Sequence, residues 1–233
     1  PTRMAYLISI GSTVCGTTAI MATAPVIKAN KNEVSYAIAN ITLFGILSML
    51  IYPYFANIYF DGQPLLIGLF LGTSIHETSQ VAAAGLIYDQ QFNSPETLNI
   101  ATVTKLIRNT FLVIMIPLFA FLYNRNNSKE KSYSILSIFP YFVLGFVGMI
   151  IFRNFGDQVF ISNNSNNWIE IINFIKSSSK VFLTMAMAAI GLSTNLKDIK
   201  NMGYKPFIVG FIGMSTVGVV CLLTLEAYVR FFI

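Results

Sequence analysis

The feature that most restricts the fold of this chain is the run from Val34 to Phe55, which contains no charged side chain. A helix over such a run can cross a hydrocarbon layer of about 30 Å. Of the 233 residues, 55% are hydrophobic and 11% are charged, against about 25% charged residues in a typical soluble domain. Since a soluble fold could not cover so much apolar surface, the sequence predicts a polytopic membrane protein in contact with the lipid bilayer.

The apolar segments and the basic residues between them predict how the chain crosses the membrane. We expect apolar segments at about Met4–Ala29, Val34–Phe55, Leu65–Tyr88, Leu98–Tyr123, Ile135–Phe152, Val181–Leu196 and Pro206–Val229, and an amphipathic surface helix over Trp168–Lys176. Lys and Arg concentrate in short cytoplasmic loops. The loops that carry them here contain Lys28 and Lys31, then Arg125, Lys129 and Lys131, then Lys197, Lys200 and Lys205. The loop Asn57–Pro64 has neither residue type and is placed on the outer side.

The number of membrane crossings that the loops require indicates that the segment Leu65–Tyr88 does not cross like the others. Between the outer loop and the basic loop at Arg125 the chain must cross an odd number of times, yet two apolar segments lie there. Because Leu65–Tyr88 is the polar, Gly-containing one, we expect it to be re-entrant or a pair of half-helices, covered by protein or water. The alternative is that it spans and one basic loop lies outside. The expected fold is all-α, with about six spanning helices plus this re-entrant or broken segment, in a single transmembrane domain over residues 1–233.

The first apolar segment is also interrupted, between Gly11 and Thr18. Each Gly weakens a helix by about 1 kcal/mol relative to Ala. One interpretation is a small-residue face for close helix packing; the other is a broken helix whose freed backbone groups line a site. In the second case the candidate substrate-binding residues are Ser12, Thr13, Cys15, Gly16, Thr17 and Thr18.

Another polar stretch, Ser193, Thr194 and Asn195, ends the sixth apolar segment. It is either a polar helix C-cap or a second helix break that faces the first, because many transporters pair two broken helices at the midplane through an inverted repeat. The second interpretation makes these three residues further candidates for substrate binding.

The stretch Gly72–Gly85 holds the only His in the sequence. Ser74 is a candidate substrate-binding residue there, and His76, Glu77 and Gln80 are candidates for coupling or gating. Ionisable groups at membrane depth usually serve a substrate or ion path, so Glu77 is expected to bind a proton or a sodium ion. A His-Glu-x-x-His zinc motif needs a second His where Gln80 stands, and we therefore expect no metal site.

Lys105 and Arg108 lie three residues apart in the fourth apolar segment and share a helix face. They are either anion ligands or charge partners, and they join the coupling or gating candidates. The planar guanidinium of Arg108 suits an oxyanion. The competing interpretation is a static ion pair of Glu77 with one of them, which would only fix helices together.

Other features exclude whole classes of function. The net charge is +5, but the basic residues lie mostly in loops, so no nucleic-acid partner is expected. No phosphate loop, dinucleotide fingerprint or catalytic triad is present, and no cofactor is expected beyond a coupling Na⁺ or H⁺. Cys15 and Cys221 lie in apolar segments and are expected to be reduced thiols.

Five ordered motifs extend along nearly the whole chain. They are Gly11-x-x-x-Cys15-Gly16-x-x-Ala19-Ile20-x-Ala22-x-Ala24-Pro25-Val26; Ala37-Ile38-Ala39 with Leu43-Phe44-Gly45; Ser74-Ile75-His76-Glu77-x-x-Gln80-Val81; Lys105-Leu106-x-Arg108; and Ala186-Met187-Ala188-Ala189-Ile190-Gly191-Leu192 before Lys205-Pro206. Together they resemble the YeiH family of bacterial inner-membrane proteins, often labelled sulfate exporters. The resemblance implies a multi-pass transporter related to the bile-acid symporter-like fold, with discontinuous helices crossing near the midplane.

The resemblance has two departures. Family members are about a third longer at the N-terminus, so this chain, which begins at Pro1 without an initiator Met, is expected to be a fragment lacking N-terminal helices of the family fold. Thr17 and Thr18 stand where the family tends to have Ala or Ser. The second departure leaves the substrate assignment open.

These observations favour a secondary transporter of a small anion such as sulfate, an organic sulfonate or another organic acid, and the family label implies an exporter. Backbone N–H groups at the Gly11–Thr18 break would bind the anion as helix N-termini do. The alternative is a membrane protein that does not transport, either a structural subunit or an intramembrane enzyme using His76 and Glu77 with Cys15 as nucleophile. A homo-oligomer is compatible with each.

Overall fold

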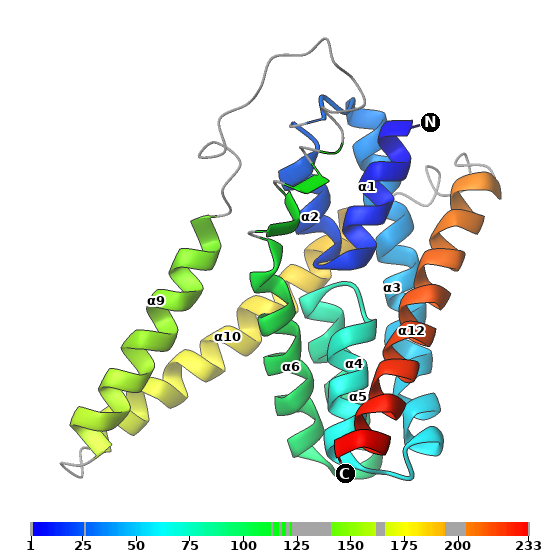
Figure 1. The fold of residues 1–233 in the computed structure, drawn as a ribbon. Helices are drawn as coiled ribbons and strands as arrows, with labels where there is room; N and C mark the ends of the chain where they lie inside the picture. The colour runs from blue at the N-terminus through cyan, green and yellow to red at the C-terminus, as the bar shows by residue number, and fades with distance from the viewer. Residues whose placement is uncertain are drawn as a thin grey trace. The chain divides into compact units, whose positions relative to one another are not determined.

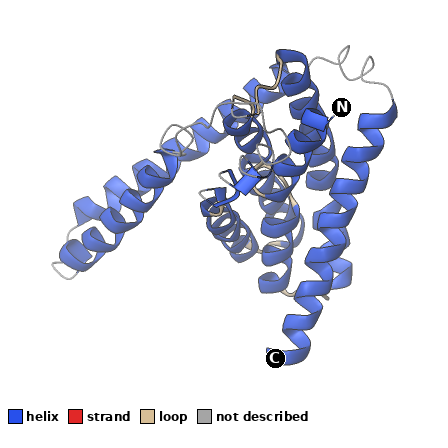
Figure 2. Cartoon of the chain, turned by 45° about the horizontal axis from the view of Figure 1, so that its top comes forward, coloured by secondary structure: helices blue, strands red, loops and turns tan. Residues whose placement is uncertain are grey.

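The computed structural model describes residues 2–25, 27–112, 114–116, 118–119, 122, 141–161, 166–193 and 204–232. In these residues the chain consists of helices and loops, with no strand (Figure 2). The all-α prediction is thereby confirmed for the described part. The chain forms two compact units, a first unit of Pro1–Phe139 with Asn195–Ile233 and a second unit of Pro140–Thr194.

The first unit is organised around α3 (Lys31–Tyr59). A capping box starts this helix, in which the Glu33 N–H donates to Asn30 Oδ1 at 2.9 Å and the Asn30 N–H donates to Glu33 Oε2 at 2.9 Å. Among the described helices, α3 and the stretch Phe207–Phe231 of α12 (Tyr204–Phe232) are long and apolar enough to cross a membrane. The count of about six spanning helices stays a prediction.

Two short helices, α1 (Thr2–Thr13) and α2 (Gly16–Thr23), form a hairpin beside the first half of α3 (Figure 1). The helix breaks at Val14 and Cys15, so the predicted interruption of this segment is confirmed. The start of α1, the end of α2 and the start of α3 share a buried cluster of Leu7, Ile8, Ile20, Ala24, Ile27, Ala37 and Ile41. The chain therefore turns back at the break instead of continuing across.

A second hairpin, α4 (Pro64–Ser74) and α5 (Thr78–Phe92), lies beside the second half of α3 (Figure 1). α4 starts directly after α3 ends, and α5 returns to the same end, where the Tyr88 hydroxyl donates to Asn57 Oδ1 at 2.8 Å. The break at residues 75–77 confirms the broken segment predicted here. The return of α5 agrees with the re-entrant interpretation rather than with a continuous span.

α6 (Pro95–Thr110) packs along both helices of the second hairpin. Gly72 lets it approach α4 closely, because a Cβ at this position would lie 2.6 Å from the Ala101 carbonyl oxygen. Beyond the end of α6, Leu112 and Ile116 join a buried cluster with residues of α1 and α2. This part of the chain therefore passes the tip of the first hairpin.

α12 lies along α3 and runs in the same direction. The ring centroids of Phe44 and Phe207 are 4.9 Å apart, and further along the Tyr59 hydroxyl donates to the Glu226 carboxylate. The helices α3, α6 and α12 also expose large apolar side chains, which include Leu50, Ile51, Ile58, Val103, Ile107, Phe211, Ile212, Leu223 and Phe231. Large exposed apolar surface marks contact with a membrane or a partner.

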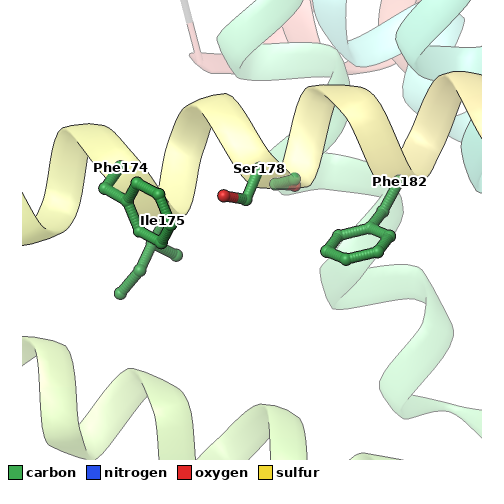
Figure 3. Close-up of a pocket in the computed structure, with 5 residues that line it drawn as sticks. Phe174, Ile175, Ser178 and Phe182 are labelled. Carbon is green, nitrogen blue, oxygen red and sulfur yellow. The ribbon is translucent and has the colours of Figure 1, made fainter.

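The second unit consists of α9 (Tyr141–Gly156), the π-helical turn η1 (Asp157–Ile161) and α10 (Asn166–Ser193). The sequence predicted an amphipathic helix and a separate apolar helix within α10, but neither Gly nor Pro stands between them, so one helix continues through both. An open hollow on α10 is lined by Phe174, Ile175, Ser178, Ser179 and Phe182 (Figure 3). All of these residues belong to one helix and none is ionisable, so we assign no chemistry to the hollow.

Asp157 links α10 to the end of α9. The Trp168 Nε1–H donates to Asp157 Oδ1 at 2.8 Å, and Arg153 Nε donates to Asp157 Oδ2 at 2.7 Å. Both hydrogen bonds stabilise the carboxylate and therefore hold the pKa of Asp157 below its ordinary value. The bond from Trp168 lowers this pKa more than the bond from Arg153 does.

Candidate functional site

The tips of the two hairpins meet each other between α3 and α6. The Gly16 N–H, at the start of α2, donates to the His76 carbonyl at 3.1 Å. Hydroxyls beside each break donate to carbonyls one turn earlier, at 2.9 Å for Ser12 and 2.6 Å for Ser74. Such side-chain bonds compete with the helical hydrogen-bond ladder, which explains why the chain leaves the helix at these positions.

Glu77 reaches from the second hairpin to the first. The residue is 4% exposed, and its Oε1 accepts the Thr17 N–H at 2.7 Å. The carboxylate therefore satisfies a free N–H at the N-terminus of α2, where the helix dipole favours a negative charge. Gly16 makes this approach possible, since a Cβ there would lie 2.7 Å from Glu77 Oε1.

Lys105, on α6, is fully buried and binds both tips. Its Nζ donates to the carbonyls of Val14 at 2.8 Å, Ile75 at 2.9 Å and His76 at 2.6 Å. Three acceptors use all three N–H bonds of an ammonium group, so the geometry fits a charged lysine. The carbonyls follow the C-terminal ends of α1 and α4, where the helix dipole attracts a cation.

Arg108 binds the same two helix ends one turn further along α6. Its Nη2 donates to the Ser12 carbonyl at 2.9 Å, and its Nη1 donates to the Thr73 carbonyl at 2.6 Å. Nε and Nη2 also donate to the Thr13 carbonyl at 3.1 and 2.9 Å, and Nη1 to the Ile75 carbonyl at 3.1 Å. The sequence suggested an oxyanion as the partner of the Arg108 guanidinium, but in the structure this group donates to backbone carbonyls.

The ion pair that the sequence allowed between Glu77 and Lys105 or Arg108 is not formed in the described structure. The carboxylate binds a backbone N–H and both cations bind carbonyls. The physical reason is that helix ends meet here, and their unpaired backbone groups carry partial charges that compete for the side chains.

Gln80 holds the second hairpin against α3. Its Nε2 donates to the buried Thr42 carbonyl at 3.3 Å. Its amide oxygen packs directly on Gly45, where a Cβ would collide with it. Gln80, which stands where a zinc-protease motif needs its second His, therefore makes a contact that positions the second hairpin.

His76 is 1% exposed, and neither ring nitrogen has a hydrogen-bond partner in the described structure. Cys15 is near but is not bonded to the imidazole; its Sγ lies 3.9 Å from Thr78 Oγ1. The same hydroxyl oxygen accepts from Asn109 Nδ2 at 3.0 Å. Within the described ranges, no three His, Cys, Asp or Glu side chains gather as a metal site requires.

Most of the candidate residues lie at the two tips or on the face of α6 beside them. They are Ser12, Thr13, Cys15, Gly16, Thr17 and Thr18 of the first hairpin, Ser74, His76, Glu77 and Gln80 of the second, and Lys105 and Arg108. Ser193 is the last residue of α10 in the second unit, and Thr194 and Asn195 lie outside the described residues. One of the two interpretations of that stretch, the other being a helix C-cap, set it opposite the first break; in the described part of the chain Ile75–Glu77 meet the first break.

The sequences of the two tips form an internal repeat, a signal that becomes visible only when the first and third apolar segments are aligned with each other. Gly11–Ile20 and Gly72–Val81 match at a constant offset, with Gly first in both and Thr shared at positions 17 and 78. Elsewhere Ser exchanges with Thr, and Val with Ile. The structure respects the repeat, because Lys105 binds the counterpart carbonyls of Val14 and Ile75.

Comparison with known proteins identifies the family. A family model described as conserved hypothetical protein 698 matches residues 1–210. The chain belongs to this family. Its curated relatives are named UPF0324 membrane proteins. FN0533 of Fusobacterium nucleatum is 38% identical over 219 residues, which is 91% of this chain and 62% of the relative. SAG1125 of Streptococcus agalactiae is 36% identical over 207 residues, 89% and 59% of the two chains. A relative from Haemophilus influenzae is 34% identical over 212 residues, 89% and 58%.

The UPF0324 assignment agrees with the resemblance to the YeiH family and with the exposed apolar helices. The chain spans about three fifths of the length of these curated relatives. No solved structure matches it. This UPF0324 chain therefore belongs to a family of membrane proteins.

Proposed function

We propose that this UPF0324 protein is a secondary transporter of a small anion, such as sulfate, an organic sulfonate or another organic acid, coupled to H⁺ or Na⁺. The observation that supports it is the meeting of two short hairpins tip to tip, with Glu77, Lys105 and Arg108 at the junction. Transporters place their sites where discontinuous helices meet near the midplane. The proposal includes a multi-pass protein of the bacterial inner membrane, with about six spanning helices in a bile-acid symporter-like arrangement.

The cost of this junction supports transport over a purely structural role. Ionisable side chains at membrane depth are expensive, and they usually line a path for a solute or an ion. Broken helices leave backbone groups that a continuous helix would satisfy by itself. A bundle whose only task is assembly can pack small and apolar residues instead, so the concentration of costly groups at one level favours a transport site.

Glu77 is well placed to couple transport to a cation. The ionised carboxylate accepts the Thr17 N–H and so joins the two tips. A protonated carboxyl group is a weaker acceptor, and a bound Na⁺ would compete for the same lone pairs. Either event would loosen the contact between the hairpins, which is how ion binding could be linked to opening of the junction.

Catalysis has less support from the geometry than transport. An enzyme using Cys15 as nucleophile would need His76 within hydrogen-bond reach to activate the thiol. Both ring nitrogens of His76 are without a partner, so this pair is not assembled in the structure. We therefore propose neither an enzymatic role nor a cofactor other than the coupling ion.

Reconstituted vesicles test this proposal. Uptake of labelled sulfate, an organic sulfonate and a monocarboxylate is followed under an imposed pH or sodium gradient. The variants are Glu77→Gln and the matched control Glu96→Gln, whose side chain is exposed on α6. We expect uptake to follow the gradient in the wild type and the control and to lose that dependence in Glu77→Gln. Failure of the wild type to move any of the anions refutes the proposal, and unchanged coupling in Glu77→Gln removes Glu77 from the mechanism.

A further inference from the structure

The Arg108 guanidinium has two edges, and each edge binds a different hairpin. Nη1 donates to the Thr73 and Ile75 carbonyls of the second hairpin, at 2.6 and 3.1 Å. Nε and Nη2 donate to the Thr13 carbonyl of the first hairpin at 3.1 and 2.9 Å, and Nη2 also donates to the Ser12 carbonyl at 2.9 Å. One side chain of α6 therefore bridges the two tips.

The partner of the edge formed by Nε and Nη2 fits that edge incompletely. Both N–H groups share the single oxygen of the Thr13 carbonyl. The same two N–H groups match two oxygens of a carboxylate or another oxyanion, in the bidentate arrangement that arginine favours. Hydrogen bonds to an ionised acceptor are also about twice as strong as those between neutral groups. An oxyanion is therefore a better partner for this edge than the carbonyl that binds it.

The position of Thr13 lets a ligand approach this edge. Thr13 is the last residue of α1 and is exposed. Its hydrogen bonds with Arg108 Nε and Nη2 are exposed as well, whereas those that Nη1 makes with the second hairpin are partly buried. The two edges thus differ in access, and the accessible edge is the one suited to an oxyanion.

The second hairpin stays with α6 when the tips part, because the two pack closely. A Cβ at Gly72 would lie 2.6 Å from the Ala101 carbonyl oxygen, and a Cβ at Gly68 would lie 2.7 Å from Ile100 Cβ. The second hairpin and α6 bind the first tip through its backbone, at the carbonyls of Ser12, Thr13 and Val14 and the N–H groups of Gly16 and Thr17. Departure of the first tip therefore frees one edge of Arg108 while Nη1 keeps its partners.

Buried apolar contacts favour the joined tips when no ligand is present. Ile10, Val14 and Cys15 of the first hairpin share a buried cluster with Leu112 and Ile116. A ligand that binds only the parted tips shifts this equilibrium through its affinity for that state. Cys15 is 7% exposed in the joined state, so the reactivity of its thiol reports the parting.

We propose that the Nε and Nη2 edge of Arg108 is the anion-binding group of the transporter, and that the tip of the first hairpin occupies it until an oxyanion takes its place. The ligand carries two oxygens on one carbon or sulfur atom, as a carboxylate, a sulfonate or sulfate does. It accepts the two N–H groups that the Thr13 carbonyl accepts here, while Thr73 and Ile75 hold the guanidinium through Nη1. The inference rests on the proposed transport function and names the residue and the movement by which the anion is bound.

Thiol labelling of Cys15 tests the displacement, in a Cys221→Ser background that leaves this thiol alone. The probes are the potassium salts of lactate, methanesulfonate and sulfate, and potassium chloride at equal ionic strength is the control, since chloride has no paired oxygens. We expect labelling to accelerate with at least one oxyanion, by about tenfold at ten times the concentration that doubles the rate. The three probes show which oxyanion the site takes, and no acceleration beyond that with chloride overturns the inference.

Arg108→Lys isolates the paired N–H groups, because lysine keeps the charge but lacks the planar edge. The matched control is Arg230→Lys, at an exposed position of α12. Each variant is compared with itself, with and without the oxyanion, so a change in its resting rate does not enter the ratio. We expect the control to keep the acceleration and Arg108→Lys to lose it. Acceleration that persists in Arg108→Lys overturns the inference.

A disulfide between the tips gives a second test that leaves Arg108 unchanged. Cys15 Sγ lies 3.9 Å from Thr78 Oγ1, so Thr78→Cys in the same background places a second thiol beside Cys15. Oxidation joins the tips, and a reductant releases them in the same protein. We expect the unfolding midpoint to rise more with oxyanion concentration in the reduced form than in the oxidised form. General salt stabilisation acts on both forms, so equal rises overturn the inference.

The vesicle assay separates this inference from the transport proposal. Labelling that an oxyanion accelerates and Arg108→Lys abolishes, without uptake of any anion, supports the site and refutes transport. Uptake that continues in the oxidised Thr78→Cys protein supports transport and refutes the site.

Discussion

Replacing Lys105 by Met tests whether α6 holds the two hairpins together. Met keeps most of the buried stem but removes Nζ, which leaves the carbonyls of Val14, Ile75 and His76 without this donor. The Val14 carbonyl is left unbonded, which costs about 1–3 kcal/mol. The Ile75 and His76 carbonyls each lose one of two hydrogen bonds, since they keep Arg108 Nη1 and the Gly16 N–H, and each loss costs about 0.5–1.5 kcal/mol. The total is about 2–6 kcal/mol, and removing a buried ammonium offsets part of it. We expect the free energy of unfolding to fall by about 3 kcal/mol.

Two measurements check this expectation. Denaturant unfolding in detergent compares Lys105→Met with Lys176→Met, which replaces an exposed lysine of α10. Thiol labelling reports on the tips directly, because Cys15 is 7% exposed there; in a Cys221→Ser background its rate follows the fraction of molecules in which the tips are apart. Since each 1.4 kcal/mol is about tenfold in an equilibrium, labelling should accelerate by about a hundredfold. A midpoint equal to that of the control, together with unchanged labelling, would refute the reasoning.

Other predictions concern packing at the tips and the second unit. Gly16→Ala places a Cβ 2.7 Å from Glu77 Oε1, so overpacking should lower the free energy of unfolding by about 1–3 kcal/mol. Gly145→Ala in α9 has no atom within 4 Å of the added Cβ, so in the same titration it should not lower the free energy of unfolding and should raise it by up to about 1 kcal/mol. The hydrogen bonds that lower the pKa of Asp157 stabilise the unit above the ordinary Asp range, and this stabilisation is lost only as the pH falls through the lowered pKa. Fluorescence of Trp168, the only Trp in the sequence, should therefore stay constant through about pH 4 and change below it; a step at the ordinary value, or the same step in Asp157→Leu, contradicts the assignment.

The sequence predicted the helix breaks because local residues decide them. Glycines and hydroxyl side chains weaken the helix between Gly11 and Thr18, and the break lies at Val14 and Cys15. The return of the second hairpin required a different kind of information, the parity of basic loops over the whole chain. Length and polarity of Leu65–Tyr88 alone would have allowed a continuous span.

The partners of the charged residues could not be predicted in the same way. Opposite charges on Glu77 and Lys105 invited an ion pair, but helix ends arrive at the same place and supply the competing N–H and carbonyl groups. A list of side chains does not contain these backbone dipoles. The repeat was visible in the sequence and pairs the correct tips, whereas Ser193 was considered only because it is polar and ends a short apolar segment.

Gly45 restricts how the second hairpin can move. The Gln80 amide packs where a Cβ of residue 45 would stand, and one turn away along α3 in either direction the chain has Ile41 and Met49. A ratchet of the hairpin along α3 by one turn would force the amide into a branched or long side chain. The contact at Gly45 therefore opposes a shear-type slide of the second hairpin along α3.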